Sequence, residues 1–191
     1  MAQNNLCAVI TGGRFKGKKL LLPSKETTRS TKAILKSSFF NTLQFDIEDC
    51  CFIEVFGGSG SMGLEALSRG AKKVYFVEKD KAAFSVLREN CKSLDMTKCI
   101  CFLDDTFTRL PQIAQSLHEA AIFYFDPPFD TRDGMSGIYE KVMELFGSLP
   151  KSKVKIAAFE HISSFKMPKI IKDFELFKSK TFGNSSISFY I

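Results

Sequence analysis

From Cys51 onward, short apolar runs alternate with longer amphipathic segments, and this alternation restricts the fold more than any other feature of the chain. The apolar runs predict strands at residues 51–56, 72–78, 99–103, 121–125 and 155–160. The segments between the strands have helical spacing at residues 61–70, 81–94, 107–120 and 137–149. Apolar strands separated by helices are typical of a parallel sheet that helices cover on both faces.

Both ends of the chain add further elements to this pattern. Residues 174–191 predict two strands joined at 183–186, and residues 6–23 predict a hairpin around a connection rich in glycine and lysine. Apolar residues within 24–43 recur at helical spacing and predict a helix. We therefore predict an α/β, Rossmann-like fold with a mostly parallel seven-stranded sheet, helices on both faces, a C-terminal antiparallel hairpin and an N-terminal β-hairpin extension.

The basic residues are concentrated near the N-terminus. Residues 1–41 contain eight basic residues and one acidic residue, a net charge of +7, whereas the whole chain carries +6 and residues 42–191 therefore carry −1. This distribution is expected of a nearly neutral body with a segment that contacts a polyanion, although a merely solvated basic segment would have the same composition. We divide the chain into a basic hairpin and helix at 1–41 and a catalytic domain at 42–191.

Length and composition fit a single intracellular domain. The chain has 191 residues, of which 45% are hydrophobic. It contains no run of about 18 apolar residues and no signal-peptide pattern, so we expect a cytoplasmic protein. The six cysteines lack C-x-x-C spacing and only two histidines accompany them, so we expect reduced thiols and no metal site. His161 is expected at the surface, just after the last parallel strand.

A glycine-rich turn lies between the first of these strands and the helix that follows it. Gly58, Gly60 and Gly63 have G-x-G-x-x-G spacing, which lets backbone amides approach a ligand at a helix N-terminus. Glu78 ends the next strand about twenty residues later, where a carboxylate can accept hydrogen bonds from ribose hydroxyls. The pair of features predicts a cofactor that contains a ribose.

Two cofactors fit that pair. A nicotinamide dinucleotide would place its pyrophosphate on the turn, and S-adenosylmethionine would place its methionine part and ribose there. Glu54 lies just upstream of the turn, where a carboxylate would repel a diphosphate and favour an ammonium or a sulfonium. Asp105, at the end of the third strand, could accept from an adenine amine. The residues therefore favour S-adenosylmethionine.

The apolar run at 121–125 is followed by the sequence Asp-Pro-Pro-Phe. In an open parallel sheet, ligands bind beyond the carboxyl ends of the strands, near the point where the strand order reverses. The Asp126 carboxylate and the Pro127 carbonyl are two acceptors for an exocyclic amine, and two successive prolines hold them in place. Phe129 offers a ring on which a flipped base can stack. A stiff turn with a half-buried ring is the structural alternative, but together with the glycine turn the motif favours methyl transfer to nitrogen.

Seven stretches carry a wider similarity: "ITGGRFKGKKLLLP", "TRSTKAILKSSFFN", "FGGSGSMGLEALSRGA", "VEKD", "DDTF", "FDPPF" and "AFEH". In this order, and over nearly the whole chain, they resemble the RsmD family of class I S-adenosylmethionine-dependent methyltransferases, which methylate the N2 amine of one guanine in 16S ribosomal RNA. The resemblance implies that the glycine turn, Glu78 and Asp105 hold the cofactor, that residues 126–129 hold the guanine, and that the hairpin grips RNA. Ser30, Ala33 and Ser37 depart from the residues usual in the family.

The candidate site residues form three groups. The catalytic candidates are Asp126, Pro127, Pro128 and Phe129. The cofactor-binding candidates are Glu54, Phe56, Gly57, Gly58, Ser59, Gly60, Gly63, Glu78, Lys79, Asp105, Thr106 and Asp126. The RNA-binding candidates are Arg14, Lys16, Lys18, Lys19, Arg29 and Lys32. The expected cofactor is S-adenosyl-L-methionine, and the expected partner of a monomeric protein is 16S rRNA in the small ribosomal subunit or an assembly intermediate, with no membrane and no metal.

Other functions stay open at this point. A DNA or RNA methyltransferase acting on adenine N6 or cytosine N4 would use the same Asp-Pro-Pro-aromatic turn, although a separate target-recognition domain is missing from this sequence. A dinucleotide-dependent oxidoreductase would need only the glycine turn and Glu78. A catalytically inactive RNA-binding module would leave the intact Asp-Pro-Pro-Phe sequence unexplained.

Overall fold

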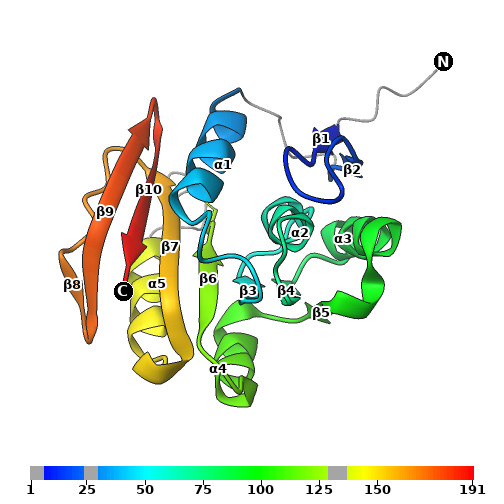
Figure 1. Ribbon diagram of the computed structural model, residues 1–191. Coiled ribbons are helices and arrows are strands. Elements are labelled where there is room, and N and C mark those ends of the chain that lie inside the picture. The colour runs from blue at the N-terminus through cyan, green and yellow to red at the C-terminus, as the bar shows by residue number, and fades with distance from the viewer. Residues whose placement is uncertain (1–6, 24–29, 129–136) are drawn as a thin grey trace.

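The computed structural model describes residues 7–23, 30–128 and 137–191, with side chains from residue 33 onward in the second range. Five strands form its parallel part: β3 (Cys51–Glu54), β4 (Lys73–Glu78), β5 (Cys99–Leu103), β6 (Ala121–Phe125) and β7 (Val154–Ile162). Three strands continue it in antiparallel fashion: β8 (Ile170–Ile171), β9 (Phe174–Phe182) and β10 (Ser185–Tyr190). Within the described residues the strand order is β5–β4–β3–β6–β7–β10–β9–β8 (Figure 1).

Helices cover both faces of this sheet. One face packs against α1 (Ser30–Thr42), α2 (Ser61–Ser68) and α3 (Lys81–Leu94), and the other against α4 (Thr106–Ser116) and α5 (Ile138–Gly147). Short 3₁₀ turns, η1 (Met96–Lys98) and η2 (Lys151–Lys153), lead into β5 and β7. Because successive strand residues point to opposite faces, Phe52 lies in the first core and Ile53 in the second. Strands apolar on both faces are thus explained by two hydrophobic layers.

The strand order reverses between β3 and β6. From β3 the chain runs outward to β4 and β5 on one side, and then returns to β6 and β7 on the other. Glu54 is the register partner of Tyr124, and the Val55 amide donates to the Tyr124 carbonyl at 2.9 Å. The carboxyl ends of β3 and β6 are therefore adjacent, at the position where ligands bind in open α/β sheets.

The N-terminal hairpin packs directly on the body of the protein. Its strands, β1 (Cys7–Val9) and β2 (Lys19–Leu21), are antiparallel and lie beside α2 and α3 (Figure 1). Ile10 and Leu20 are fully buried and belong to the same hydrophobic core as Phe39 and Phe40 of α1. The division of the chain at residues 41 and 42 stays a prediction about the roles of its parts, since their described residues share one core.

The predicted α/β fold is confirmed, with two differences. The sheet gains an eighth strand, β8, because Ile170 and Ile171 pair with the start of β9, a contact too short to leave a periodic pattern. His161 was expected at the surface, and this is wrong. β7 extends past Glu160 because β10 pairs with it as far as Ile162, so His161 is only 3% exposed and its Nε2 lies 2.9 Å from Ser188 Oγ.

Two further properties concern the described part of the chain. No helix there combines the length and the apolar character that crossing a membrane requires. The six cysteines are all free thiols.

Candidate active site

The glycine turn closes against β4 through backbone hydrogen bonds. The Gly57 amide donates to the Val77 carbonyl at 2.7 Å, and the Gly60 amide donates to the Gly57 carbonyl at 2.7 Å. Gly60 has φ +78°, which favours glycine, and a Cβ on Gly63 would lie 2.5 Å from Cε1 of Phe76. Both glycines therefore have structural reasons to be present: they let the turn and α2 approach β4 closely.

Glu54 fixes the start of α2 to the end of β3. Its side chain is buried, and its carboxylate accepts the Gly63 amide at 2.7 Å and the Met62 amide at 3.4 Å. A carboxylate is stabilised at this end of a helix because the first amides have no partner within the helix and carry partial positive charge. The predicted contact of Glu54 with a cofactor stays a prediction beside this structural role.

Glu78 links the end of β4 to the glycine turn. One carboxylate oxygen accepts the Gly58 amide at 2.8 Å, and the other accepts the Asp80 amide at 2.7 Å. Each carboxylate oxygen can accept more than one hydrogen bond, so the side chain retains acceptor capacity at the position predicted for the ribose hydroxyls. The residue is half-buried, and the amides hold its carboxylate beside the turn.

The end of β5 is tied to the same region. The Thr106 hydroxyl, which is buried, donates to the Val55 carbonyl at 2.7 Å. The Asp105 carboxylate accepts the Phe107 amide at 2.9 Å and caps α4. The remaining cofactor candidates differ in exposure: Phe56 is half-buried, Ser59 is buried and Lys79 is exposed. The structure thus brings the predicted residues of β3, β4 and β5 to one edge of the sheet.

Asp126 follows β6 directly, beside the glycine turn. It is half-buried, Pro127 is buried and Pro128 is half-buried, while Phe129 lies outside the described residues. The ring of Tyr124, two residues earlier, is buried beneath α1, and its hydroxyl donates to Glu160 at 2.7 Å. Asp126 therefore lies at the end of a strand whose position is fixed by packing against α1 and by the hydrogen bond to Glu160 of β7.

Carboxylates gather around the Tyr124 hydroxyl. Burial raises the pKa of Tyr124 well above its usual value of 10, and the charges of Glu160, Asp126 and Glu54 raise it further. These three acidic side chains come from the carboxyl ends of β7, β6 and β3. A concentration of negative charge at this edge favours a cationic ligand over an anionic one, so the electrostatics favour a sulfonium or an ammonium over a diphosphate.

Two buried polar residues near the site escaped prediction. Asn90 of α3 is 2% exposed and hydrogen bonds both to the hairpin and to the glycine turn. Glu65 of α2 is fully buried and binds Thr11, Lys36 and Arg69. The available signal for Asn90 was its position within the apolar stripe of α3, between Leu87 and Leu94, where a polar residue needs a buried partner.

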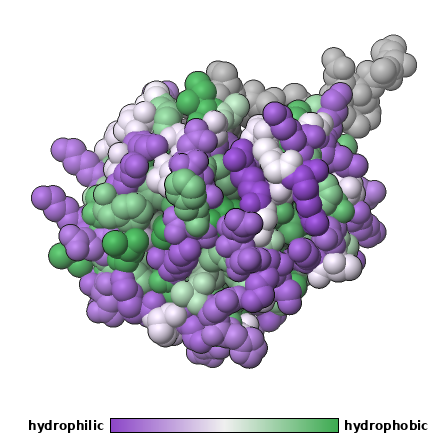
Figure 2. Space-filling model, viewed as in Figure 1, coloured by the Kyte–Doolittle hydropathy of each residue, from purple (hydrophilic) through white to green (hydrophobic). Residues whose placement is uncertain are grey.

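The described RNA-binding candidates all lie on the hairpin and are exposed: Arg14, Lys16, Lys18 and Lys19. Arg14 also forms an ion pair of 2.9 Å with Asp95, the residue that follows α3. Figure 2 shows strongly hydrophilic residues on the upper right of this face, where the hairpin and α3 lie. Arg29 and the side chain of Lys32 lie outside the described part of the structure.

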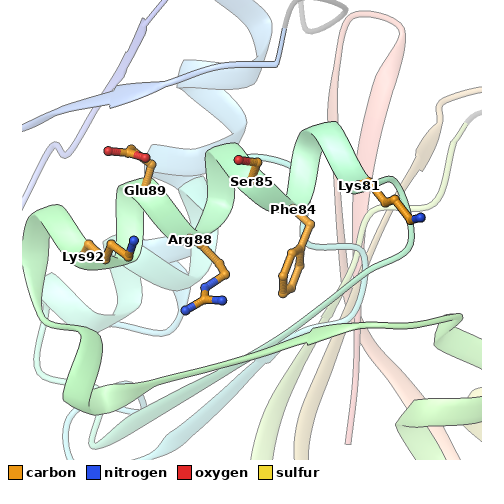
Figure 3. Close-up of a pocket in the computed structure, with 6 residues that line it drawn as sticks. All are labelled: Lys81, Phe84, Ser85, Arg88, Glu89 and Lys92. Carbon is orange, nitrogen blue, oxygen red and sulfur yellow. The ribbon is translucent and has the colours of Figure 1, made fainter.

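The outer face of α3 carries a hollow of about 290 Å³. Its lining residues are Lys81, Phe84, Ser85, Arg88, Glu89 and Lys92 (Figure 3). In Figure 3, Phe84 and Arg88 point to the same side of the helix. Lys81, the first residue of α3, follows the Glu78–Asp80 segment of the site. The hollow therefore begins beside the predicted cofactor region and runs away from it along a helix rich in cations.

Comparisons with known proteins extend over this whole arrangement. A family model described as conserved hypothetical protein 95 matches residues 8–191. The Bacillus subtilis protein YlbH, provisionally named an rRNA methyltransferase, is 27% identical over 183 residues, which are 95% of this chain and 97% of the relative. The Haemophilus influenzae protein named ribosomal RNA small subunit methyltransferase D is 36% identical over 124 residues, which are 63% of each chain.

A solved structure has the same fold. Escherichia coli yhhF, provisionally named a methyltransferase, superimposes with a TM-score of 0.75 at 25% identity and covers 96% of this chain and 97% of its own. The family match includes every candidate site residue, from Arg14 to Phe129.

Proposed function

The chain belongs to the family described as conserved hypothetical protein 95, in which the relatives described above are named rRNA methyltransferases, and we propose that it methylates the N2 amine of a guanine in 16S rRNA. Its methyl donor is S-adenosylmethionine. The observation that carries the proposal is the position of Asp126 and Pro127 directly after β6, beside the glycine turn of β3, where the strand order reverses. Ligands of open α/β sheets bind at this position. Residues that accept hydrogen bonds from an amine and a turn that binds a cofactor can therefore face the same ligand site there.

The chemistry requires a weak nucleophile to be oriented. The lone pair of the guanine amine is delocalised into the ring, and S-adenosylmethionine, when bound, supplies an electrophilic methyl group on its sulfonium. The Asp126 carboxylate and the Pro127 carbonyl accept the two amine hydrogens, which turns the lone pair toward the methyl carbon. The bound cofactor would supply the methyl group for transfer to the amine nitrogen, and the Asp126 carboxylate takes up the proton that the amine loses. Orientation and fixed acceptors supply most of the acceleration.

The cofactor contacts divide among three strand ends. Glu78 accepts from the ribose hydroxyls, Asp105 accepts from the adenine amine, and Glu54 lies toward the methionine ammonium. The negative charge that Glu54, Asp126 and Glu160 concentrate around Tyr124 supports this assignment, because a cationic donor is stabilised there and its neutral product is released more easily.

RNA lies across the basic side of the molecule. Residues 1–41 form the main RNA-binding segment, and residues 42–191 form the catalytic domain. Further RNA phosphates bind along the hollow on α3. Among the described residues, no ion pair engages Lys81, Arg88 or Lys92, so these cations are available to phosphates. The protein acts as a monomer in the cytoplasm, on the small ribosomal subunit or an assembly intermediate.

Three experiments test this function. S-adenosylmethionine or S-adenosylhomocysteine should raise the melting temperature, and NAD should not; a shift with NAD alone would mean an oxidoreductase. Labelled S-adenosylmethionine should then label one guanine in small subunits that lack their methyl groups. Replacing that guanine by inosine deletes the N2 amine, so methylation should stop. Continued labelling of the inosine, or labelling of an adenine or cytosine, would contradict the N2 assignment.

A further inference from the structure

Asn90 connects the N-terminal hairpin to the glycine turn with a single side chain. Its Nδ2 donates to the Leu21 carbonyl and to the Ser59 carbonyl, each at 2.9 Å, and its Oδ1 accepts the Leu21 amide at 2.9 Å. Leu21 is the last residue of β2, and Ser59 lies within the glycine turn. The two segments are 38 positions apart in the sequence, yet both are held by one residue of α3.

The geometry leaves little freedom to this link. Asn90 is 2% exposed, and its two donor hydrogens and its acceptor oxygen are all used. Loss of these three hydrogen bonds would be costly, above all at Ser59, whose carbonyl is buried and would lose its bond to Asn90. A displacement of β2 that preserves the hydrogen bonds must therefore shift Asn90, and with it the carbonyl of Ser59.

The other attachments of the hairpin do not reach the turn. Ser68 Oγ donates to the Gly12 carbonyl at 2.5 Å and accepts the Phe15 amide at 2.9 Å. Glu65 accepts the Thr11 amide at 2.8 Å. Glu65 lies near the middle of α2 and Ser68 at its C-terminal end, so neither residue belongs to the glycine turn that precedes this helix. Asn90 is thus distinguished by touching both functional segments.

We propose that Asn90 is a positioning residue that couples RNA binding at the hairpin to cofactor binding at the glycine turn. The inference rests on the proposed function, in which the hairpin contacts RNA and the turn contacts the cofactor. RNA that fixes β2 fixes the Ser59 carbonyl in its cofactor-binding position, and a bound cofactor fixes β2 in return. Because such coupling is reciprocal, each ligand raises the affinity for the other by the same factor.

The test measures that factor. The affinity of the protein for a 16S rRNA fragment with an abasic site at the target nucleotide, which removes direct contact between base and cofactor, is determined with and without saturating S-adenosylhomocysteine. The affinity should rise about 5-fold or more in the wild type. Asn90→Ala should reduce the factor toward one. Ser68→Ala, which weakens the hairpin attachment without touching the turn, should retain it. Equal factors in the wild type and in Asn90→Ala would overturn the proposal.

A second measurement needs no variant. On addition of S-adenosylhomocysteine alone, hydrogen exchange at the Leu21 amide should slow, because this amide donates to Asn90. The Arg14 amide, which donates to the Ser68 carbonyl at 2.8 Å, is the internal control and should be unchanged. Equal protection of both amides, or of neither, would contradict the proposal. A protein that binds neither ligand would instead refute the proposed function, whereas a protein that binds both without coupling refutes only this inference.

Discussion

The Tyr124 hydroxyl donates to Glu160 at 2.7 Å, a hydrogen bond that joins β6 to β7 just below Asp126. Tyr124 is 1% exposed and packs edge-on against Phe39 of α1, with ring centroids 5.3 Å apart. The strand that presents Asp126 is therefore fixed by a buried hydrogen bond as well as by its backbone pairing. This rigidity matters because a displaced acceptor loses its alignment with the amine.

Replacing Tyr124 by phenylalanine should destabilise the protein. Tyr124→Phe keeps the aromatic packing but removes the donor to the buried Glu160, at a cost of about 1 to 3 kcal/mol in the free energy of unfolding. Chemical denaturation measures this cost. In the double variant Tyr124→Phe, Glu160→Leu the two effects should not add, because each change removes the same hydrogen bond. Full additivity would show that the interaction between the two side chains contributes nothing to the free energy of unfolding.

Glu78→Ala should weaken cofactor binding. The lost hydrogen bonds to a charged acceptor correspond to roughly 1.5 to 3 kcal/mol in binding free energy, measured by calorimetry with S-adenosylhomocysteine. Asp80→Ala is the matched control, because Asp80 caps α3 by accepting the Ala83 amide at 2.8 Å. It should lower stability by about 1 kcal/mol and leave the affinity unchanged. Unchanged affinity in Glu78→Ala would place the ribose elsewhere.

Asp126→Ala should strongly reduce turnover while the fold and the affinity for S-adenosylhomocysteine, which lacks the sulfonium charge, persist. Removing a fixed group that acts in the transition state typically lowers the catalytic constant by about 10²- to 10³-fold. Single-turnover methylation of the rRNA measures the loss. Phe129→Ala should cause a smaller loss and weaken RNA binding, whereas Phe129→Tyr keeps the stacking face and much of the activity. A variant Asp126→Ala with normal turnover would remove this residue from the mechanism.

Neutralising the basic surface should reduce RNA affinity and its dependence on salt. Changing Arg14, Lys16, Lys18 and Lys19 together to glutamine should flatten the slope of log affinity against log salt by about 0.7 to 0.9 for each lost phosphate contact. The same change at Lys81, Arg88 and Lys92 tests whether RNA phosphates bind in the hollow on α3, and it should also flatten the slope. Both sets should leave cofactor affinity unchanged.

The control set for this experiment lies at the opposite edge of the sheet. Lys166, Lys169 and Lys172 are exposed and lie around β8, so glutamine there removes as much charge as in the α3 variant. The salt slope should stay at the wild-type value. An equal effect at both edges would mean that overall charge, and not a defined surface, governs RNA binding.

His161 should make stability fall on acidification. Burial lowers its pKa below the usual 6.5. Between that lowered pKa and 6.5, the imidazole is therefore protonated in the unfolded chain but mostly neutral in the folded protein. Its stability contribution is complete above pH 6.5 and declines as the pH falls from 6.5 toward the lowered folded pKa. Denaturation curves across this range should show the decline in the wild type. The variant His161→Gln, which does not titrate, should lack that component.

Much of the fold follows from periodicity alone. The strands at 99–103 and 121–125 agree with β5 and β6 residue for residue, because parallel strands in a sheet with helices on both faces are continuous apolar runs between polar boundaries. The family resemblance is confirmed by the match over residues 8–191. The placing of the glycine turn beside the Asp-Pro-Pro sequence also followed, since strand order in doubly wound sheets constrains which carboxyl ends are neighbours.

Contacts between distant segments could not be predicted in the same way. β8 exists only through its pairing with β9, and the burial of His161 depends on β10, which follows it by more than twenty positions. Asn90 looks like an ordinary polar helix residue until the hairpin covers it. Local patterns carry information about one element at a time, and these features depend on which elements come to lie together.

The short β8 also has a consequence for how copies of this protein meet one another. Among the described residues, β8 pairs only with Phe174 and Glu175, so most of β9 is the open margin of the sheet. The exposed Lys178 stands on that margin, opposite the bulge between Phe189 and Tyr190. Lysine and irregular backbone on an edge strand oppose its extension by a strand from another molecule. We therefore expect the exposed edge of β9 to disfavour the addition of further strands and the growth of fibrils.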